Sequence, residues 1–353
     1  MGRKAVSYLL YSISVVFTGL LLAAAVLCRY ASSVSPGEGG FWSTFALLMP
    51  VVLLANVVAL VWWTVRRKWV VLLMPLAALA LNLGYISAMV QLPDFKDAGD
   101  PHDIRIATLN VNGFRRLASM PATAGAVAAM MDRERVDVLC LQEFVDSREF
   151  PADSIGKVFA RRMPYFIYEG GIALASRYPI LDHKYVRFPD TSNDYLHADL
   201  LVGEDTVRVF SVHLQTSGID QLRHRFRKDY NRDAPVDKML GELEHNSKIR
   251  AEQVGEIRAE MDASPYPVIL AGDFNESNMS SEMMVKLKEK WEIISTSSNT
   301  FMNTATPKRI DYIVLYKGNK AACEVLGTAV PSYDEINVNK VSDHLPVLVD
   351  IKK

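Results

Sequence analysis

The chain has 353 residues, 50% of them hydrophobic, and its formal net charge is −1. This length exceeds one compact domain of ordinary size and predicts two structural units. The first 91 residues contain six basic residues and one acidic residue, so the remainder carries a net charge of −6. A protein that holds nucleic acid by neutralising its phosphates needs a basic surface. The charge balance therefore argues against a tight DNA-binding module, although it leaves a nuclease open.

Three long apolar segments occupy residues 6–27, 45–65 and 69–90. Each is close to the roughly 20 residues that a helix needs to cross the hydrocarbon core of a bilayer. The first resembles a signal peptide, but it lacks a convincing cleavage site and two further apolar segments follow it. We therefore predict a transmembrane region with three α-helices over residues 1–91, followed by a polar linker at 92–103. The alternative is a buried helical hairpin of a soluble protein.

The basic residues of short loops predict the orientation of these helices, because such loops stay in the cytoplasm. Arg3 and Lys4 precede the first apolar segment, and the Arg-Arg-Lys sequence at 66–68 separates the second from the third. With three spans, every residue after Val90 then lies outside the cytoplasm. We predict an integral protein of the cell (inner) membrane whose second domain, residues 104–353, is extracytoplasmic or periplasmic.

Beyond the linker, short strand-like segments alternate with turns and a few helical patterns. The predicted strands are Ile104–Val111, Val136–Leu141, Gly171–Ser176, Leu196–Leu201, Val207–Leu214, Pro267–Leu270, Ile310–Tyr316 and Leu345–Ile351. Helical patterns cover Ala122–Arg135, where Thr123 is a candidate cap, the charged segment Gln221–Met261, and Ser280–Trp291. Many strands with interspersed helices predict an α+β layered fold in which sheets pack together and helices lie outside.

Four of these strands end in an acid, an amide or an imidazole, and two others begin with such residues. The side chains concerned are Asn110, Glu143, His213, Asp273, Asn275, Asp311, Asp343 and His344. If the two strands that begin with these residues run antiparallel to their neighbours, their starts meet the ends of the other strands at one rim. The sequence therefore predicts that six separate segments converge on a single pocket.

Carboxylate and amide oxygens with few thiols form a hard site, which suits Mg²⁺ or Mn²⁺ better than zinc. The remaining acids and the two histidines can position water and share protons. Each residue alone has a simpler explanation. Asn110 can be a turn residue, Asp311 can pair with Arg309, and His213 can be a satisfied structural histidine. Their occurrence together, in this order, favours a catalytic site.

These segments resemble the motifs of the endonuclease/exonuclease/phosphatase family, the DNase I-like metal-dependent phosphoesterases. The matching pieces are Thr-Leu-Asn110, Leu-Gln-Glu143, Leu-Ala-Ser-Arg177-Tyr-Pro-Ile, Val-His213-Leu, Gly-Asp273-Phe-Asn275, Arg-Ile-Asp311-Tyr-Ile and Ser-Asp343-His344. They extend over residues 104–351, essentially the whole second domain, and together they are highly specific. The resemblance implies an α/β (α+β) four-layer sandwich, in which two packed mixed β-sheets are flanked by helices and the site lies at one end.

The resemblance also implies roles for the residues of the rim. Glu143 is expected to be the principal metal ligand, with Asn110 and Asp343 close to the metal, Mg²⁺ or Mn²⁺. Asp273 and Asn275 are expected to orient the attacking water and the phosphate.

The two histidines and one arginine complete this expected site. His344, paired with Asp311, and His213 are expected to bind the phosphate and to take part in proton transfer. Arg177 is expected either to bind substrate or to serve a structural role.

The predicted activity is metal-assisted, in-line hydrolysis of a phosphodiester or phosphomonoester. A domain outside the cytoplasm does not meet chromosomal DNA, so the expected substrate is a lipid head group, a small phosphoester or extracellular nucleic acid. The lipid bilayer is the other expected partner, and no obligate protein partner is predicted. The Arg-His-Arg-Phe-Arg-Lys sequence at 223–228 either contacts a phosphate-rich substrate or forms an exposed helical face. The alternatives are an extracytoplasmic nuclease and a non-catalytic membrane scaffold or receptor, although every main position of the motif is filled.

Overall fold

The computed structural model describes residues 3–31, 48–83, 85–86, 104–230, 232–277, 281–294, 299–302, 308–316, 324–329 and 340–352. The chain divides into two compact units, each built from separate segments. The first unit comprises residues 1–91, 218–248 and 278–285, and the second comprises the rest. The predicted linker at 92–103 lies outside the described residues.

The helices of the first unit include α1 (Arg3–Ala31), α3 (Met49–Val65), α4 (Trp69–Leu81) and α8 (Ile219–Tyr230). Among the described residues, one helical segment, Ala5–Ala31, is long and apolar enough to cross a membrane. The 13 residues of α4 reach about 20 Å at a rise of about 1.5 Å per residue, short of a hydrocarbon core of about 30 Å. The prediction of three spanning helices is therefore wrong for the described residues.

Local chemistry explains why α3 and α4 are shorter than their apolar segments. A proline lies in the first turn of α3, where its missing N–H costs nothing and its fixed φ favours a helix start. Helix α4 ends before Asn82, whose side-chain amide donates to the carbonyl of Ala78 at 2.8 Å. Side chains of this type compete with the backbone for hydrogen bonds and weaken a helix.

Polar contacts tie α1 to α3 inside the first unit. The indole N–H of Trp63 donates to the hydroxyl of Thr18 at 2.8 Å, and the amide of Asn56 donates to the carbonyl of Leu21 at 3.3 Å. Phe17 and Leu20 of α1 remain 60% and 62% exposed. An apolar helix that is hydrogen-bonded on one side and uncovered on the other suits an apolar environment.

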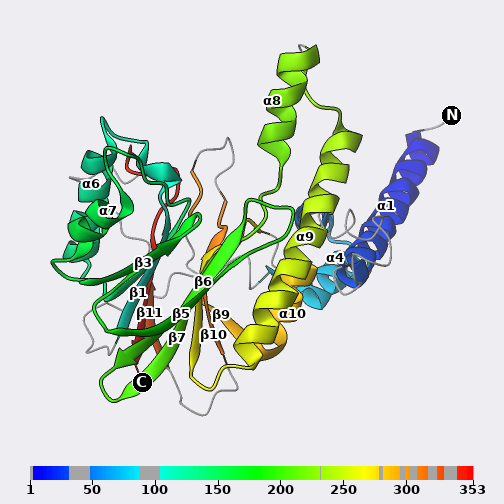
Figure 1. Cartoon of the computed structure of the whole chain (residues 1–353). Helices are drawn as coiled ribbons and strands as arrows, with labels where there is room; N and C mark the ends of the chain where they lie inside the picture. The colour runs from blue at the N-terminus through cyan, green and yellow to red at the C-terminus, as the bar shows by residue number, and fades with distance from the viewer. Residues whose placement is uncertain are drawn as a thin grey trace. The chain divides into compact units, whose positions relative to one another are not determined.

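Among the described residues, the second unit holds two mixed sheets of six strands each. Strands of both sheets are labelled in Figure 1. The first has the order β11-β12-β1-β2-β4-β3, and the second has the order β5-β6-β7-β8-β10-β9. The strands are β1 (Ile104–Asn110), β2 (Val138–Gln142), β3 (Tyr165–Glu169), β4 (Ile172–Ser176), β5 (Ile180–Arg187), β6 (Asp194–Val202), β7 (Asp205–His213), β8 (Val268–Asp273), β9 (Trp291–Ile294), β10 (Asp311–Tyr316), β11 (Glu324–Ala329) and β12 (Val347–Lys352).

Helices cover the outer faces of these sheets. Helices α6 (Met120–Arg133) and α7 (Ala152–Phe159) share a hydrophobic core with β1, β2 and β4. On the second sheet, the later part of α9 (Val236–Asp262) lies over β5 and β6, where its Glu260 pairs with Lys184 and His197. Two mixed sheets with flanking helices were predicted, and the structure confirms them.

The core between the sheets is built from the strict alternation of the strands, because successive side chains point to opposite faces. Ile106, Cys140, Leu196, Val209 and Ile269 all point into this core. The same alternation then places the polar residues at the strand ends on the same inner face.

The structure departs from the predicted elements at several boundaries. Helix α6 begins at Met120 rather than Ala122, because Ser119 is its cap and accepts a hydrogen bond from the N–H of Ala122. Thr123 is a buried residue inside that helix. The outermost strands β3, β5, β9 and β11 were not predicted. Strands β3 and β5 illustrate the reason. They are only partly buried, so they lack the apolar run that marks a central strand.

Gly272 on β8 provides a test of the tight contact between neighbouring strands. A Cβ atom at this position would lie 2.0 Å from the carbonyl oxygen of Val212. We expect Gly272→Ala to lower the free energy of unfolding by about 1–3 kcal/mol, the usual cost of overpacking. Denaturant unfolding of the full chain in detergent measures this change.

The matched control is Gly125→Ala in α6, where a Cβ atom meets nothing within 4 Å. This variant should be more stable than the wild type by about 0.5–1 kcal/mol, because alanine favours a helix. A Gly272→Ala protein as stable as the wild type would contradict the described packing of β7 on β8.

Candidate active site

The six segments singled out in the sequence meet at one end of the two sheets. Strands β1 and β2 run parallel, with Asn110 aligned to Gln142, the residue before Glu143. Strands β7 and β8 also run parallel and end together at His213 and Asp273. Strands β10 and β12 run antiparallel to β8 and β1, so their starts lie at the same end. The strand ends and strand starts therefore meet at one rim, as predicted from the sequence.

A polar layer separates the apolar core from this rim. The side-chain amide of Gln142 donates to the hydroxyl of Ser211 on the other sheet at 3.1 Å. Its carbonyl oxygen accepts from the hydroxyl of Thr108 at 3.1 Å. All three side chains are fully buried. They satisfy one another and connect the two sheets directly beneath the charged residues.

Asn110 connects two carboxylates of the rim. Its Nδ2 donates to Oε1 of Glu143 at 3.0 Å and to Oδ2 of Asp273 at 3.1 Å, while its Oδ1 accepts from the backbone N–H of Asn112. The side chain of Glu143 is 44% exposed, so its carboxylate faces the open end of the rim. Glu143 has a φ of 49°, in the left-handed region that non-glycine residues adopt only rarely.

The carboxylate of Asp343 is held by two side chains that follow β1, those of Asn112 and Arg116. Its Oδ1 accepts from the side-chain amide of Asn112 at 2.7 Å, and its Oδ2 pairs with Arg116 at 2.9 Å. The hydroxyl of Ser342 donates to the carbonyl of Asn110 at 2.6 Å. Burial favours the neutral acid, but the hydrogen bond from Asn112 and the nearby positive charges lower the pKa of Asp343 below its ordinary value.

His344, Asp311 and Asp273 form a buried group. Nδ1 of His344 lies 2.9 Å from Oδ2 of Asp311, and its Nε2 lies 3.8 Å from Oδ2 of Asp273. Burial alone would lower the pKa of His344, but the two carboxylates raise it to about 10. Burial, and then the charge of Asp311, raise the pKa of Asp273 to about 6. The positively charged imidazole of His344 lies between the two carboxylates and offsets the free-energy cost of burying them.

The structure also places His213 and Asn275 at the rim. Nε2 of His213 lies 3.8 Å from Asp273 and 4.0 Å from Glu143. The backbone N–H of Asn275 donates to Oδ1 of Asp273 at 2.8 Å, and its side-chain amide donates to the carbonyl of Leu214 at 2.9 Å. Asn275, with a φ of 50°, is a second left-handed residue at this end of the sheets.

Arg177 is not brought to this group. It follows β4, whose last residue, Ser176, is aligned with Val138 at the start of β2. Arg177 therefore lies at the opposite end of the sheet from Glu143. There its guanidinium pairs with Asp137 at 3.2 Å and its backbone N–H donates to the carbonyl of Asp137. This contact supports the structural role that the sequence left open.

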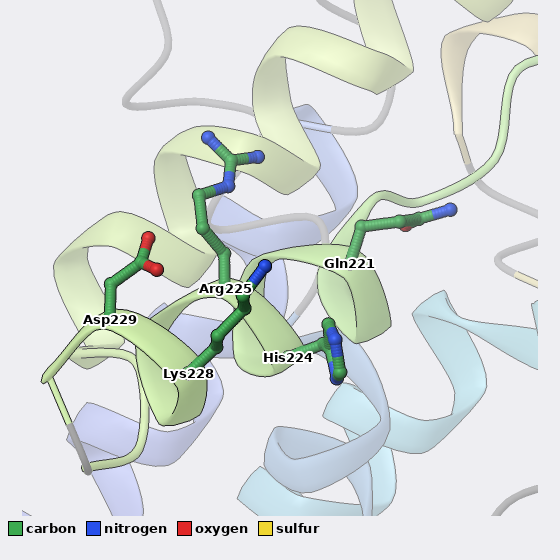
Figure 2. A pocket seen from close by; sticks show the side chains of 5 residues that line it. All are labelled: Gln221, His224, Arg225, Lys228 and Asp229. Atoms are coloured by element: carbon green, nitrogen blue, oxygen red, sulfur yellow. The ribbon is translucent and has the colours of Figure 1, made fainter.

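The basic sequence at 223–228 lies on α8, which belongs to the first unit. Figure 2 shows an open pocket on this helix, lined by Gln221, His224, Arg225, Lys228 and Asp229. Most of these side chains are exposed, and the pocket contains none of the rim residues. The exposed helical face that the sequence allowed is therefore what the structure describes.

Asn112 and Arg116, among other residues near the rim, were missed in the sequence; these two side chains hold the two oxygens of Asp343. The Asn112-Gly113 pair is an ordinary turn signal, so its composition gave no reason to assign it a role at the site.

The donor atoms described at the rim are mainly carboxylate oxygens, with imidazole nitrogens and without thiols, which suits a hard divalent cation. Two sets of residues are available. Among the described residues, Asp273, Asp311 and His344 form the group whose ligand atoms all lie within 4.8 Å of one another. The second set, expected from the sequence, is Glu143 with Asn110 and Asp343. In the structure Oδ1 of Asn110 accepts from Asn112, and the two oxygens of Asp343 contact Asn112 and Arg116. The carboxylate of Glu143 is open to solvent, whereas the first set is buried.

Comparisons with known proteins agree with this geometry. The model of the Endonuclease/Exonuclease/phosphatase family matches residues 107–344, and the model of a domain of unknown function (DUF8431) matches residues 7–89. No curated protein sequence matches the chain.

Several solved structures share the fold. They include zebrafish (D. rerio) TDP2 complexed with a single-strand DNA product (16% identity, 71% of this chain and 99% of that one, TM-score 0.53). Beta toxin from Staphylococcus aureus (19% identity, 71% and 100%, TM-score 0.51) and the human Nocturnin catalytic domain with bound sulfate (16% identity, 72% and 96%, TM-score 0.52) are also similar. At these identities the likeness establishes the fold alone. The family match covers well over half of the chain and includes every rim residue, so the chain belongs to the endonuclease/exonuclease/phosphatase family.

Proposed function

We propose that the chain is a membrane-anchored, divalent-metal-dependent phosphoesterase that hydrolyses a phosphodiester or phosphomonoester. The observation that carries this proposal is the convergence of Glu143, Asn110, Asp273, His213 and the Asp311-paired His344 at one rim. A fold kept only as a scaffold has no need to bury the carboxylates of Asp273 and Asp311 together with the imidazole of His344, because buried charges cost stability.

In this proposal Glu143 would hold Mg²⁺ or Mn²⁺, together with Asn110 and Asp343. A bound cation would supply positive charge next to the phosphoryl oxygens. Asn110 keeps the carboxylate of Glu143 in place through its 3.0 Å hydrogen bond. Asn112 and Arg116 likewise keep the carboxylate of Asp343 in place, through a hydrogen bond and an ion pair.

The remaining rim residues act on water and phosphate. Asp273 accepts a proton from the attacking water, and the backbone of Asn275 fixes the orientation of that carboxylate. The new P–O bond forms as the bond to the leaving oxygen breaks, so the leaving oxygen needs a proton. His213 and His344 provide positive charge and protons on the phosphate side, and Asp311 orients His344.

Location narrows the substrate in this proposal. With the basic N-terminus in the cytoplasm, one spanning helix places the second unit outside, just as three would. A lipid head group, a small phosphoester or extracellular nucleic acid is then within reach, whereas chromosomal DNA is not. An extracytoplasmic nuclease is the second candidate, and its support is the single-strand DNA product bound to the zebrafish protein of the same fold.

A panel of substrates tests the reaction class and separates these candidates. The purified full chain with Mg²⁺ should hydrolyse at least one of DNA, RNA, phospholipid, inositol phosphate and bis(p-nitrophenyl) phosphate. Preference for phospholipid supports a lipid substrate, and preference for DNA or RNA supports the nuclease.

Single substitutions test the assignment of the rim. We expect Glu143→Gln and His344→Ala each to lower kcat by at least about 100-fold, because each removes a charge that acts on the reacting phosphate. The Arg177→Ala variant is the matched control. It removes a charged side chain from the same domain at the opposite end of the sheet, so kcat should stay within about twofold of the wild type. The buried Asp137 that loses Arg177 keeps its ion pair with Arg162. Near-wild-type turnover by Glu143→Gln or His344→Ala, with metal present, would refute the assignment.

Membrane anchoring by α1 can be tested separately. The helix is hydrogen-bonded to α3 through Thr18 and Trp63, so removing it as a cleaved signal would break a packed unit. We expect the mature protein to retain residues 1–31 and to stay in the membrane pellet after alkaline carbonate extraction. Intact-mass measurement and immunoblotting check both. A mature chain that begins after Ala31 and is soluble would disprove the anchor.

A further inference from the structure

Asp194 is a buried carboxylate that the sequence analysis did not select. It opens β6 and is 3% exposed. Leu196 and Ala198 of the same strand point into the core between the sheets, so the alternation of the strand turns Asp194 to that inner face as well. Within the described part of the chain, its Oδ1 has no hydrogen-bond partner. Such an atom is costly to bury and calls for a functional explanation.

The neighbours of Asp194 on the sheet are the catalytic candidates. Asp194 lies directly opposite His213 on β7, His213 is aligned with Asp273 on β8, and Asp273 lies opposite Asp311 on β10. Residues in such pairs place their side chains on the same face, with Cβ atoms about 4.5–5.5 Å apart in antiparallel pairs. The four side chains therefore form one row across four strands, in which His213 lies between two carboxylates.

The second oxygen of Asp194 is held firmly from behind. Its Oδ2 accepts from the backbone N–H of Gly171 at 2.9 Å and from the hydroxyl of Tyr185 at 3.1 Å. Gly170 has a φ of 57°, and a Cβ atom there would lie 2.5 Å from this oxygen and 2.1 Å from the hydroxyl of Tyr185. The turn at Gly170 thus leaves room for both hydrogen bonds. They fix one oxygen of Asp194 and leave the other free.

The imidazole ring of His213 makes its described ion-pair contacts at the rim through one of its two nitrogens, Nε2. Its Nε2 lies on the side of Asp273 and Glu143. An imidazole that works through one nitrogen is usually fixed by a hydrogen bond from the other to a carboxylate, which sets its tautomer and its orientation.

We propose that Asp194 is a positioning residue for His213: its Oδ1, which has no partner among the described residues, accepts a hydrogen bond from Nδ1 of His213 when the imidazole turns towards it. The inference rests on the proposed function, because it assigns the support of a residue in that site. It gives His213 a partner equivalent to the one that Asp311 provides for His344. Burial raises the pKa of Asp194, while the hydrogen bonds from Gly171 and Tyr185, and then the nearby His213, act against that rise.

A double-mutant cycle on the full chain tests this proposal, with bis(p-nitrophenyl) phosphate and Mg²⁺. Asp194→Asn keeps the shape of the side chain and removes its charge. We expect kcat to fall by about 10-fold or more and KM to change by less than about 3-fold, because orientation is lost rather than binding. In the His213→Ala background, Asp194→Asn should have no further effect, since residues that act as a unit are not additive.

A second variant keeps the test decisive if Asp194→Asn does not fold. Tyr185→Phe removes one donor to Oδ2 and leaves the carboxylate in place. It should lower kcat by a smaller factor, about 2–5-fold, and this loss too should vanish in the His213→Ala background. Equal losses in both backgrounds, or an unchanged kcat in folded Asp194→Asn, would overturn the positioning role alone. A wild type inactive on every phosphoester would overturn the proposed function and this inference with it.

Discussion

The arrangement of the site depends on the boundary where the apolar core between the two sheets gives way to charged side chains. Along each central strand the inner-facing residues are aliphatic, then polar, then charged. On β7 the sequence of inner residues is Val209, Ser211 and His213. Charges at the edge of a dry core are costly unless they are paired. This constraint accounts for the bonds of Asn110 to two carboxylates and for the pairing of His344 with Asp311.

The backbone at the same rim is unusual for a related reason. Asn112, Glu143 and Asn275 all have positive φ values and all follow the ends of strands β1, β2 and β8. A left-handed residue turns the chain sharply, so the side chain after a strand can be directed across the rim instead of continuing the alternation. Such conformations cost free energy and persist where the surrounding structure enforces them, as it does at functional sites. The rim therefore combines paired charged side chains with left-handed backbone residues that orient side chains across it.

Much of this arrangement could be predicted from the sequence because the central strands are continuous apolar runs that each stop at a polar residue. The convergence of Glu143, His213, Asp273 and His344 follows from that pattern and from the direction of two strands. Asp194 could have been found by extending the alternation of Leu196 one step towards the N-terminus, but the predicted strand began too late. The position of Arg177 depends on the direction of β4, which the motif around it does not encode. The lengths of α3 and α4 depend on local breaks at a proline and at Asn82, whereas hydropathy alone predicted longer segments.

The apolar helix α1 and the charged rim belong to separate units. In the proposed function, the helix anchors the chain in a membrane and the rim binds a cation and a phosphoester. The central claim concerns the rim, and its most direct test is the metal dependence of hydrolysis by the purified full chain. Release of p-nitrophenol from bis(p-nitrophenyl) phosphate in the presence of Mg²⁺ should stop when EDTA is added and return when Mg²⁺ is restored in excess. Hydrolysis that continues at the same rate in EDTA would contradict a metal-dependent site built on Glu143.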